Sequence, residues 1–208
     1  MAQSTQAQVF SVDGVIPIIH PSSFVDPSAV VIGDVTIGAN CYIGPNVSLR
    51  GDMASIEIGE GSNIQDNCML HCMTGIPTIV GAWGHIGHGA VVHSAQLAAN
   101  VLVGMNAVVM DESFIGENSV VAAMAFVKTG QQVAPNTLVA GIPARVVREL
   151  SEEEIEWKRD GTRCYHELVE RCKTTFERVE PLTEREQNRP TLNVKMVPKK
   201  LSLFENTD

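Results

Sequence analysis

The 208-residue sequence is poor in aromatic side chains and has few basic ones in its first two thirds. Aromatic residues make up 5% of the chain against 44% hydrophobic residues in all, so the core must be built from aliphatic side chains. No run of eighteen apolar residues occurs, and the start of the chain has no basic region followed by an apolar stretch. The sequence therefore indicates neither a membrane span nor a secretory signal, and we expect a cytoplasmic protein without a membrane partner.

The shortage of positive charge also excludes a nucleic-acid footprint, because the formal net charge is −9. Residues 1–144 carry two basic side chains, Arg50 and Lys128, against ten acidic ones. From Arg145 onward there are thirteen basic and fourteen acidic side chains, which is typical of a solvated helical segment. The five cysteines form no CxxC pair, and their odd number favours reduced thiols over a disulfide framework.

A six-residue repeat runs through the chain from Val25 to Val139. Asn stands three places after the repeated position in seven repeats and Gly in three more, and both residues tolerate the left-handed backbone of a tight corner. Short strands that are joined by corners and stacked on one another predict a parallel β-helix. The repeated position is always Val, Ile or Leu, at residues 25, 31, 37, 43 and 49; 58, 64 and 70; 80, 86 and 92; and 97, 103, 109, 115, 121, 127, 133 and 139.

This pattern resembles the hexapeptide-repeat family, whose members form left-handed β-helices with three hexads in each triangular coil. The resemblance implies the handedness and the three-sided section. We expect an all-β fold with a C-terminal α-helix: a lead-in over residues 1–24, a left-handed parallel β-helix over 25–144, an amphipathic helix within 145–183 and an extended arm over 184–208. The extra residues after Leu49 and after Leu70 are expected to form outward loops.

The predicted helix has a readable start. Ser151 to Glu154 form a capping box, and Pro181 is expected to end the helix. An apolar stripe at helical spacing must lie on the β-helix of the same chain or on that of a neighbour. The stripe consists of Tyr165, Leu168, Val169, Cys172, Phe176 and Val179.

Four of the six histidines lie between His71 and His93. With three hexads in each coil, Arg50, His71 and His93 each follow an equivalent aliphatic residue on successive coils. Strand alternation then points all three outward in one column, about 5 Å apart.

A second outward column is predicted on the neighbouring face. It contains Gln65, and it stacks Asp66 against His88 one coil away. A corner at Gly89 separates His88 from the first column. The sequence therefore suggests a three-histidine site that is assembled between two chains of a homotrimer.

Three imidazoles with one open position are the ligand set of a catalytic zinc ion, and iron and cobalt accept the same ligands. A structural reading stays open beside this one: stacked imidazoles also hydrogen-bond or fill a trimer interface without a metal, and Arg50 with Asp66 is a plausible interface ion pair. His85 is either a supporting partner or a plain corner residue. Cys72 is a candidate nucleophile, although no base stands at a fixed spacing from it.

The strings Arg50-Gly51-Asp52, Asn63-Ile64-Gln65-Asp66-Asn67, His71, Gly87-His88 and Val92-His93 resemble the motifs of γ-class carbonic anhydrases. The resemblance implies a lyase in which metal-bound hydroxide attacks CO2 at a trimer interface. It also implies that His71, His88 and His93 hold the metal, that Arg50 and Asp52 form an intersubunit pair, and that Gln65 orients the bound water, with Asn63 and Asp66 as supports. Met53 replaces the glutamate of strongly active members, and residues 72–77 lack a carboxylate, so the usual proton shuttle is missing.

A narrower similarity covers almost the whole chain. Gly84-His85-Ile86-Gly87-His88, the segment 102–111 and Trp157-Lys158-Arg159 resemble the CaiE/PaaY family of carnitine operon and phenylacetic acid degradation proteins. This resemblance implies an alternative activity, thioester hydrolysis or acyl transfer on acyl-CoA. A third reading is a non-catalytic trimeric assembly protein that keeps a metal as an interface staple. The two enzymatic readings differ in their small-molecule substrate, which is CO2 or bicarbonate in one and acyl-CoA in the other.

Overall fold

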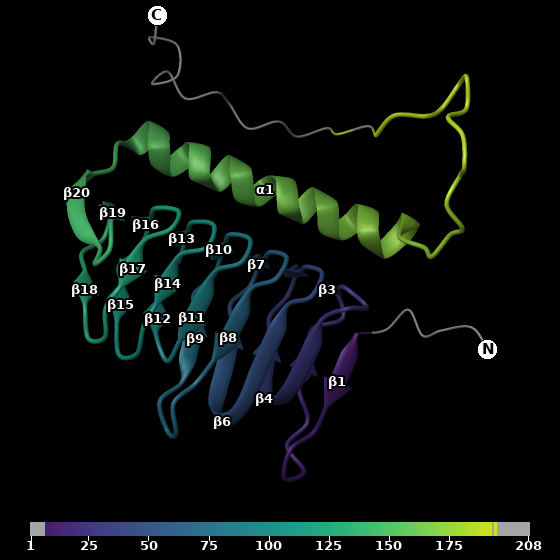
Figure 1. Cartoon of the computed structure of the whole chain (residues 1–208). Coiled ribbons are helices and arrows are strands. Elements are labelled where there is room, and N and C mark those ends of the chain that lie inside the picture. The colour runs from purple at the N-terminus through teal and green to yellow at the C-terminus, as the bar shows by residue number, and fades with distance from the viewer. Residues whose placement is uncertain (1–6, 193, 195–208) are drawn as a thin grey trace, which may run out of the picture.

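The computed structural model describes residues 7–192 and 194 as a left-handed parallel β-helix with one long helix laid along it (Figure 1). The strands form a three-sided prism. Of the nineteen repeat positions, all except Val25 are buried, and Val25 packs against the same core. The predicted aliphatic core is therefore confirmed.

The strands on the first face carry the histidine column. In stacking order they are β1 (Gln8–Phe10), the first half of β4 (Val30–Ile37), the first half of β6 (Ser48–Ile58), β8 (Met69–His71), β11 (Val91–His93), β14 (Val108–Val109) and β17 (Phe126–Val127). The second face consists of β2 (Ile18–Ile19), the second halves of β4 and β6, β9 (Thr78–Val80), β12 (Gln96–Leu97), β15 (Phe114–Ile115) and β18 (Gln132–Val133).

The third face is a separate sheet. It consists of β3 (Phe24–Val25), β5 (Tyr42–Ile43), β7 (Asn63–Ile64), β10 (His85–Ile86), β13 (Leu102–Val103), β16 (Val120–Val121), β19 (Thr137–Ala140) and β20 (Arg145–Glu149). The first two faces join in one sheet because β4 and β6 each continue around a corner. The ladders between successive coils are parallel, whereas β20 returns antiparallel to β19.

The corners have the backbone that their residues predict. All seven repeat asparagines have a positive φ, and so do Gly61, Gly89 and Gly130. The same corner position is also taken by Trp83, Glu112 and Met124, which adopt a positive φ although bulky side chains rarely do. The hexad register therefore decides the corner conformation even where the residue type is unfavourable.

Two of three expectations about the ends and interruptions of the prism need correction. Within the expected lead-in 1–24, β1 and β2 pair with β4, so the ladder begins at Gln8. The extra residues after Leu49 form a bulge within β6 rather than a separate loop, because residues 52–55 have no partner in the ladder between β4 and β6. The extra residues after Leu70 do form a turn, in which Met73 and Ile76 make an antiparallel bridge.

The helix α1 (Glu152–Thr175) begins with the predicted capping box. Ser151 Oγ accepts from the backbone nitrogen of Glu154 at 3.2 Å, and Glu154 Oε2 accepts from the backbone nitrogen of Ser151 at 2.9 Å. The helix is shorter than expected, because it ends before Phe176 rather than at Pro181, and Val179 is exposed. Segment 145–183 also includes strand β20.

Helix α1 lies on the third face of its own prism and runs back toward the first coil (Figure 1). The ring of Tyr165 contacts those of Tyr42 and His85, with centroids 5.3 and 5.4 Å apart, and Phe176 contacts Phe24 at 5.4 Å. Within the described residues, no helix is both long and apolar enough to cross a membrane. Residues 184–192 and 194 contain neither helix nor strand, and the rest of the expected arm and residues 1–6 lie outside the described residues.

Candidate active site

The predicted column of His71 and His93 is present on the first face. Strand β8 pairs with β11 so that Leu70 faces Val92 in the core and His71 faces His93 outside. The two ring centroids are 5.1 Å apart, close to the expected coil spacing, and His71 Nδ1 lies 3.1 Å from His93 Nε2. The structure thus brings two of the three predicted metal ligands together in one chain.

Each of these imidazoles is held by a carboxylate through its other nitrogen. His71 Nε2 donates to Asp52 Oδ1 at 2.9 Å, and His93 Nδ1 makes a short hydrogen bond to Asp111 Oδ1. Both inner nitrogens therefore carry lone pairs, and they face each other at hydrogen-bond distance. Such an arrangement is stable when a proton or a metal cation lies between the two nitrogens.

Arg50 stands at the end of the same column and pairs with Asp52 inside one chain. Its Nη1 lies 2.7 Å from Asp52 Oδ2. Desolvation opposes ionisation of Asp52, but hydrogen bonds from Arg50 and His71 outweigh it and lower the pKa of the carboxyl group. Arg50 and Asp52 therefore form an ion pair within one chain, and the pairings of Arg50 across an interface stay predictions.

His88 lies beyond the corner at Gly89, whose φ is +70°. Its Nδ1 lies 2.5 Å from Asp66 Oδ2, as the predicted stacking of these two residues requires, and its Nε2 is the nitrogen left for a ligand. Across residues 7–192 and 194, no group of three or more His, Cys, Asp or Glu side chains converges in a way that could hold a metal ion. A single chain thus supplies two separate halves, His71 with His93 and His88 with Asp66.

Gln65 and Asn63 lie on the third face beneath α1. Gln65 is 3% exposed, and its Nε2 donates to Asn63 Oδ1 at 2.9 Å and to His85 Nε2 at 2.7 Å. Asn63 therefore supports Gln65 directly. Because Gln65 precedes Asp66, the partner of His88, the amide belongs to the same half of the site as His88.

The nitrogens that the carboxylates leave free fit a tetrahedral metal. Two imidazole nitrogens at about 2.0–2.1 Å from zinc in tetrahedral geometry stand roughly 3.3 Å apart, close to the 3.1 Å between His71 Nδ1 and His93 Nε2. Metal-binding histidines usually donate their second N–H to a carboxylate, as all three of these histidines do. The donor set therefore suits zinc, with iron or cobalt as alternatives.

Cys72 is not placed to act as a nucleophile. It is fully buried, its Sγ donates to the Ser55 carbonyl at 3.3 Å, and burial raises the pKa of the thiol. Cys41 and Cys68 are likewise buried in the core, where burial raises the pKa of Cys68 to about 11. The candidate chemistry therefore rests on the imidazoles and carboxylates.

An apolar column stands beside the histidines on the outside of the first face. Strand pairing aligns Met69, Val91, Val108 and Phe126 on successive coils, and Met69 is 43% exposed. At the corresponding positions of the second face polar and apolar residues alternate, in the order Glu57, Ile79, Gln96, Phe114 and Gln132. The histidine-bearing face is thus the more apolar of the two uncovered faces.

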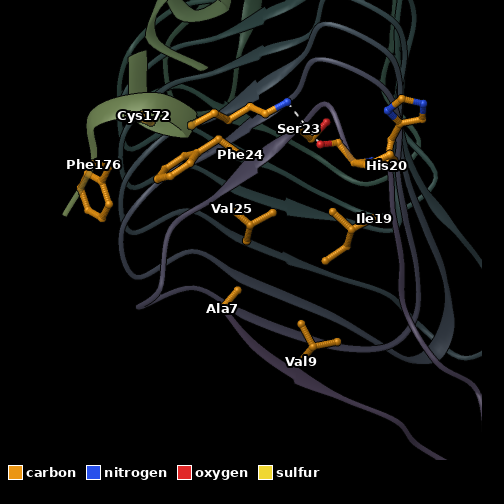
Figure 2. A pocket seen from close by; sticks show the side chains of 11 residues that line it. Ala7, Val9, Ile19, His20, Ser23, Phe24, Val25, Cys172 and Phe176 are labelled. Carbon is orange, nitrogen blue, oxygen red and sulfur yellow. Dashed lines mark hydrogen bonds between the residues drawn. The ribbon is translucent and has the colours of Figure 1, made fainter. Parts of the chain in front are cut away.

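Figure 2 shows a hollow at the opposite end of the molecule from β20. It has a volume of about 720 Å³ and lies between the first coil and the end of α1, where Phe24, Val25 and Phe176 line it. None of the histidines of the two columns and none of their carboxylate partners lines this hollow. The candidate site is instead the pair of outward columns.

Comparisons with known proteins agree with this architecture. Residues 16–51 match the family described as bacterial transferase hexapeptide (six repeats). The carnitine operon protein CaiE of Escherichia coli K12 is 49% identical over 183 residues, which cover 88% of this chain and 93% of that protein. The chain belongs to the CaiE family of hexapeptide-repeat proteins. The same identity and the same share of this chain hold for CaiE of Salmonella agona, with 92% of that protein covered.

Two solved structures resemble this CaiE-family chain beyond the fold alone. A putative acetyltransferase from Bacillus cereus has a TM-score of 0.80 and 32% identity, and the match covers 82% of this chain and 99% of that one. A hexapeptide transferase family protein from Anaplasma phagocytophilum has a TM-score of 0.76 and 37% identity, over 78% of this chain and 96% of that one. Both of these relatives carry descriptions as transferases.

Sequence reasoning missed several contributors to the site. Asp111 holds His93 and stands eighteen residues after it, which is one coil, so the hexad register could have identified it. Thr162 and Tyr165 reach His85 from α1. No sequence signal places them there, because the repeat does not fix how α1 lies on the prism.

Proposed function

We propose that this chain hydrolyses or transfers the acyl group of a CoA thioester, at a site built from His71 and His93 of one copy and His88 of a second copy. The observation that carries the proposal is the pair of imidazole nitrogens 3.1 Å apart, each backed by a carboxylate on its outer side. The relatives at 32% and 37% identity that are described as an acetyltransferase and a transferase support acyl transfer as the reaction class.

The site has the residues for a zinc ion, or for iron or cobalt, held by His71 Nδ1, His93 Nε2 and the second copy's His88 Nε2. A metal bound there supplies Lewis-acid activation of water and of a carbonyl group. Asp52, Asp111 and Asp66 each accept the outer imidazole N–H and so fix which nitrogen faces the site. Gln65 is the polar side chain next to the His88 half, and its carboxamide oxygen is the atom left to accept a hydrogen bond from water or substrate.

The proposal includes a homotrimer. The His88 half lies beyond a corner from the His71 half, so rotating a second copy against the first face is what joins them. The apolar column of Met69, Val91, Val108 and Phe126 is the surface that such a contact would bury. A cyclic arrangement of three copies then closes with three equivalent sites.

Hydration of CO2 is the second candidate, and the set of three histidines with Gln65 favours it. Met53 is 51% exposed beside Asp52 and cannot carry a proton, and residues 72–77 offer no carboxylate. Without a side chain to export protons, hydration is expected to be slow. A trimeric assembly protein without catalysis is the third candidate.

The deciding experiment measures metal and both activities on one preparation. Protein purified without added metal is analysed for zinc, iron and cobalt, and hydrolysis of a panel of acyl-CoA thioesters is followed beside CO2 hydration, before and after chelation. We expect about one metal for each chain and thioester turnover that chelation abolishes. His93→Ala should remove both metal and turnover, whereas His20→Ala, at a histidine outside both columns, should change neither.

Other outcomes overturn the proposal in distinct ways. CO2 hydration without thioester turnover would establish the second candidate, and bound metal with neither activity would establish the third. Shared ligation is tested by mixing His71→Ala and His88→Ala chains after denaturation, which should restore one complete site in some trimers. No recovery of metal in the mixed trimers, or a monomeric mass by light scattering, would refute a site between copies.

A further inference from the structure

His85 joins α1 to the half of the site that contains Gln65 and His88. It lies on β10 between Asn63 of β7 and Leu102 of β13, and its side chain points out of the third face toward α1. The ring of Tyr165 meets it edge-on at 5.4 Å, and Thr162 Oγ1 lies 3.4 Å from its Nδ1. His85 is therefore enclosed between the helix and the amide of Gln65.

The hydrogen bonds determine where the proton of His85 sits. Gln65 Nε2 is an amide donor 2.7 Å from His85 Nε2, so that ring nitrogen must accept. The ring proton is then on Nδ1. Two side-chain atoms are described near Nδ1, Thr162 Oγ1 and Asn63 Nδ2 at 3.3 Å, and of these only the hydroxyl can accept.

Helix α1 completes this chain of donors. Thr162 is fully buried, and its hydroxyl donates a hydrogen bond to the Lys158 carbonyl at 3.4 Å. A neutral His85 is also what its surroundings favour: desolvation, and then the charges of Lys158 and His88, lower its pKa to about 3. A donor relay thus runs from Gln65 through His85 and Thr162 to the backbone of α1.

This relay decides which end of the Gln65 carboxamide faces the site. Both hydrogens of Nε2 are committed, one to His85 and one to Asn63. The oxygen Oε1 is then the free end and presents an acceptor. If the side chain turned by half a revolution, oxygen and nitrogen would exchange places, and the site would be offered a donor instead.

We propose that His85 is a positioning residue, held by Thr162 and Tyr165 of α1, which locks the Gln65 carboxamide with its oxygen toward the His88 half of the site. The inference deepens the proposed function, since Gln65 belongs to that site. It assigns α1 a part in the chemistry as well as in covering the third face.

Nuclear magnetic resonance tests the orientation without any substrate. In protein with ¹⁵N-labelled histidine and glutamine, we expect His85 to show the tautomer protonated at Nδ1, and the Gln65 amide protons to exchange slowly with water. In His85→Leu the Gln65 amide resonance should move and exchange faster. His85→Gln, whose side-chain oxygen can accept from Gln65, should restore slow exchange, and Gln96→Leu on the second face is the control that should not move it.

Kinetics then tests the consequence. For the activity that the protein proves to have, His85→Leu should lower kcat by roughly 10–100-fold with an unchanged metal content and KM, and His85→Gln should recover most of it. Thr162→Val should weaken kcat in the same direction, whereas Thr162→Ser keeps the hydroxyl and should not.

The tests separate this inference from the proposed function. A proton on His85 Nε2, an unmoved Gln65 resonance in His85→Leu, or equal losses of kcat in the leucine and glutamine variants would overturn the positioning role. If thioesters are not substrates but the resonances behave as expected, the positioning role stands and the proposed function falls.

Discussion

Replacing Lys158 by methionine should change how the stability of the fold depends on pH. Lys158 of α1 is 2% exposed, and its Nζ donates to the Trp83 carbonyl at 2.5 Å and to Asn100 Oδ1 at 2.7 Å. These partners are uncharged. Burial, with repulsion from Arg159 as a smaller cause, lowers the pKa of Lys158 to about 7.

The magnitude follows from the difference between the folded and unfolded chains. An unfolded lysine titrates near pH 10.4, so between pH 7 and about pH 10 the unfolded chain binds a proton that the folded chain does not. The free energy of unfolding therefore rises with pH in this window, by about 1.4 kcal/mol for each pH unit. This contribution is complete above the unfolded pKa and is lost as the pH falls toward 7.

The assay is thermal unfolding followed by circular dichroism at a fixed protein concentration, from pH 6 to pH 10. Between pH 7 and pH 9 the free energy of unfolding of the parent protein should rise by about 2–3 kcal/mol relative to that of Lys158→Met, or roughly 4–10 °C in Tm. Lys173→Met, at an exposed lysine of the same helix, should leave the pH dependence as it is. Parallel curves for the parent and Lys158→Met would refute the reasoning, because Lys158 would then keep its charge in the fold.

Three further substitutions test the helix start, the coil spacing and the metal support. Ser151→Ala removes one side of the capping box and should cost about 1 kcal/mol in urea unfolding. Gly104→Ala would place its Cβ against the backbone nitrogen of Ala123 on the next coil. This clash should lower the soluble yield or destabilise the fold by roughly 3 kcal/mol or more, which is typical of severe packing defects. Asp111→Asn leaves His93 without its carboxylate and should weaken metal affinity by roughly 10–100-fold in a competition titration.

Each of these has a matched control. Ser151→Thr keeps the capping oxygen. Gly130→Ala meets no atom within 4 Å but has a φ of +72°, so it should cost only about 1–2 kcal/mol. Asp34→Asn changes a carboxylate that holds no histidine of the columns. If a control variant lost as much stability, or for the Asp111 pair as much metal affinity, as the substitution that it controls, the stated cause would be wrong for that pair.

The sequence predicts the prism well because each coil repeats the same requirement for an aliphatic residue inside and a left-handed corner. It fails where partners depart from the eighteen-residue step. Val9 pairs with Val31, twenty-two residues on, so β1 is out of phase with the repeat. After Leu49 the step between partners on β4 and β6 grows from eighteen residues, Gly33 to Gly51, to twenty-one, Val35 to Ile56, although the inserted residues still belong to β6.

The contacts of the candidate site are likewise predictable only where both residues belong to the repeat. The column of His71 and His93 follows from strand alternation alone, and Asp111 obeys the same coil register. The surroundings of His85 do not, because Thr162 and Tyr165 come from a helix whose place on the prism is set by packing of Tyr42, Phe24 and Phe176 rather than by any repeat. Contacts within the repeat are predictable, whereas contacts between the repeat and α1 are not.

The attachment of α1 has a consequence for how such a chain can change in length. Asn100, Asn118 and Asn136 stack one coil apart through their side-chain amides, so whole coils of eighteen residues are the units that could be gained or lost without disturbing the columns. A coil inserted after residue 121 would move the start of α1 by about 4.8 Å, which is roughly three residues of helix. Lys158 would then no longer reach Trp83. Duplication or loss of a coil therefore requires a matching change in the length of α1, and the helix fixes the number of coils in the prism.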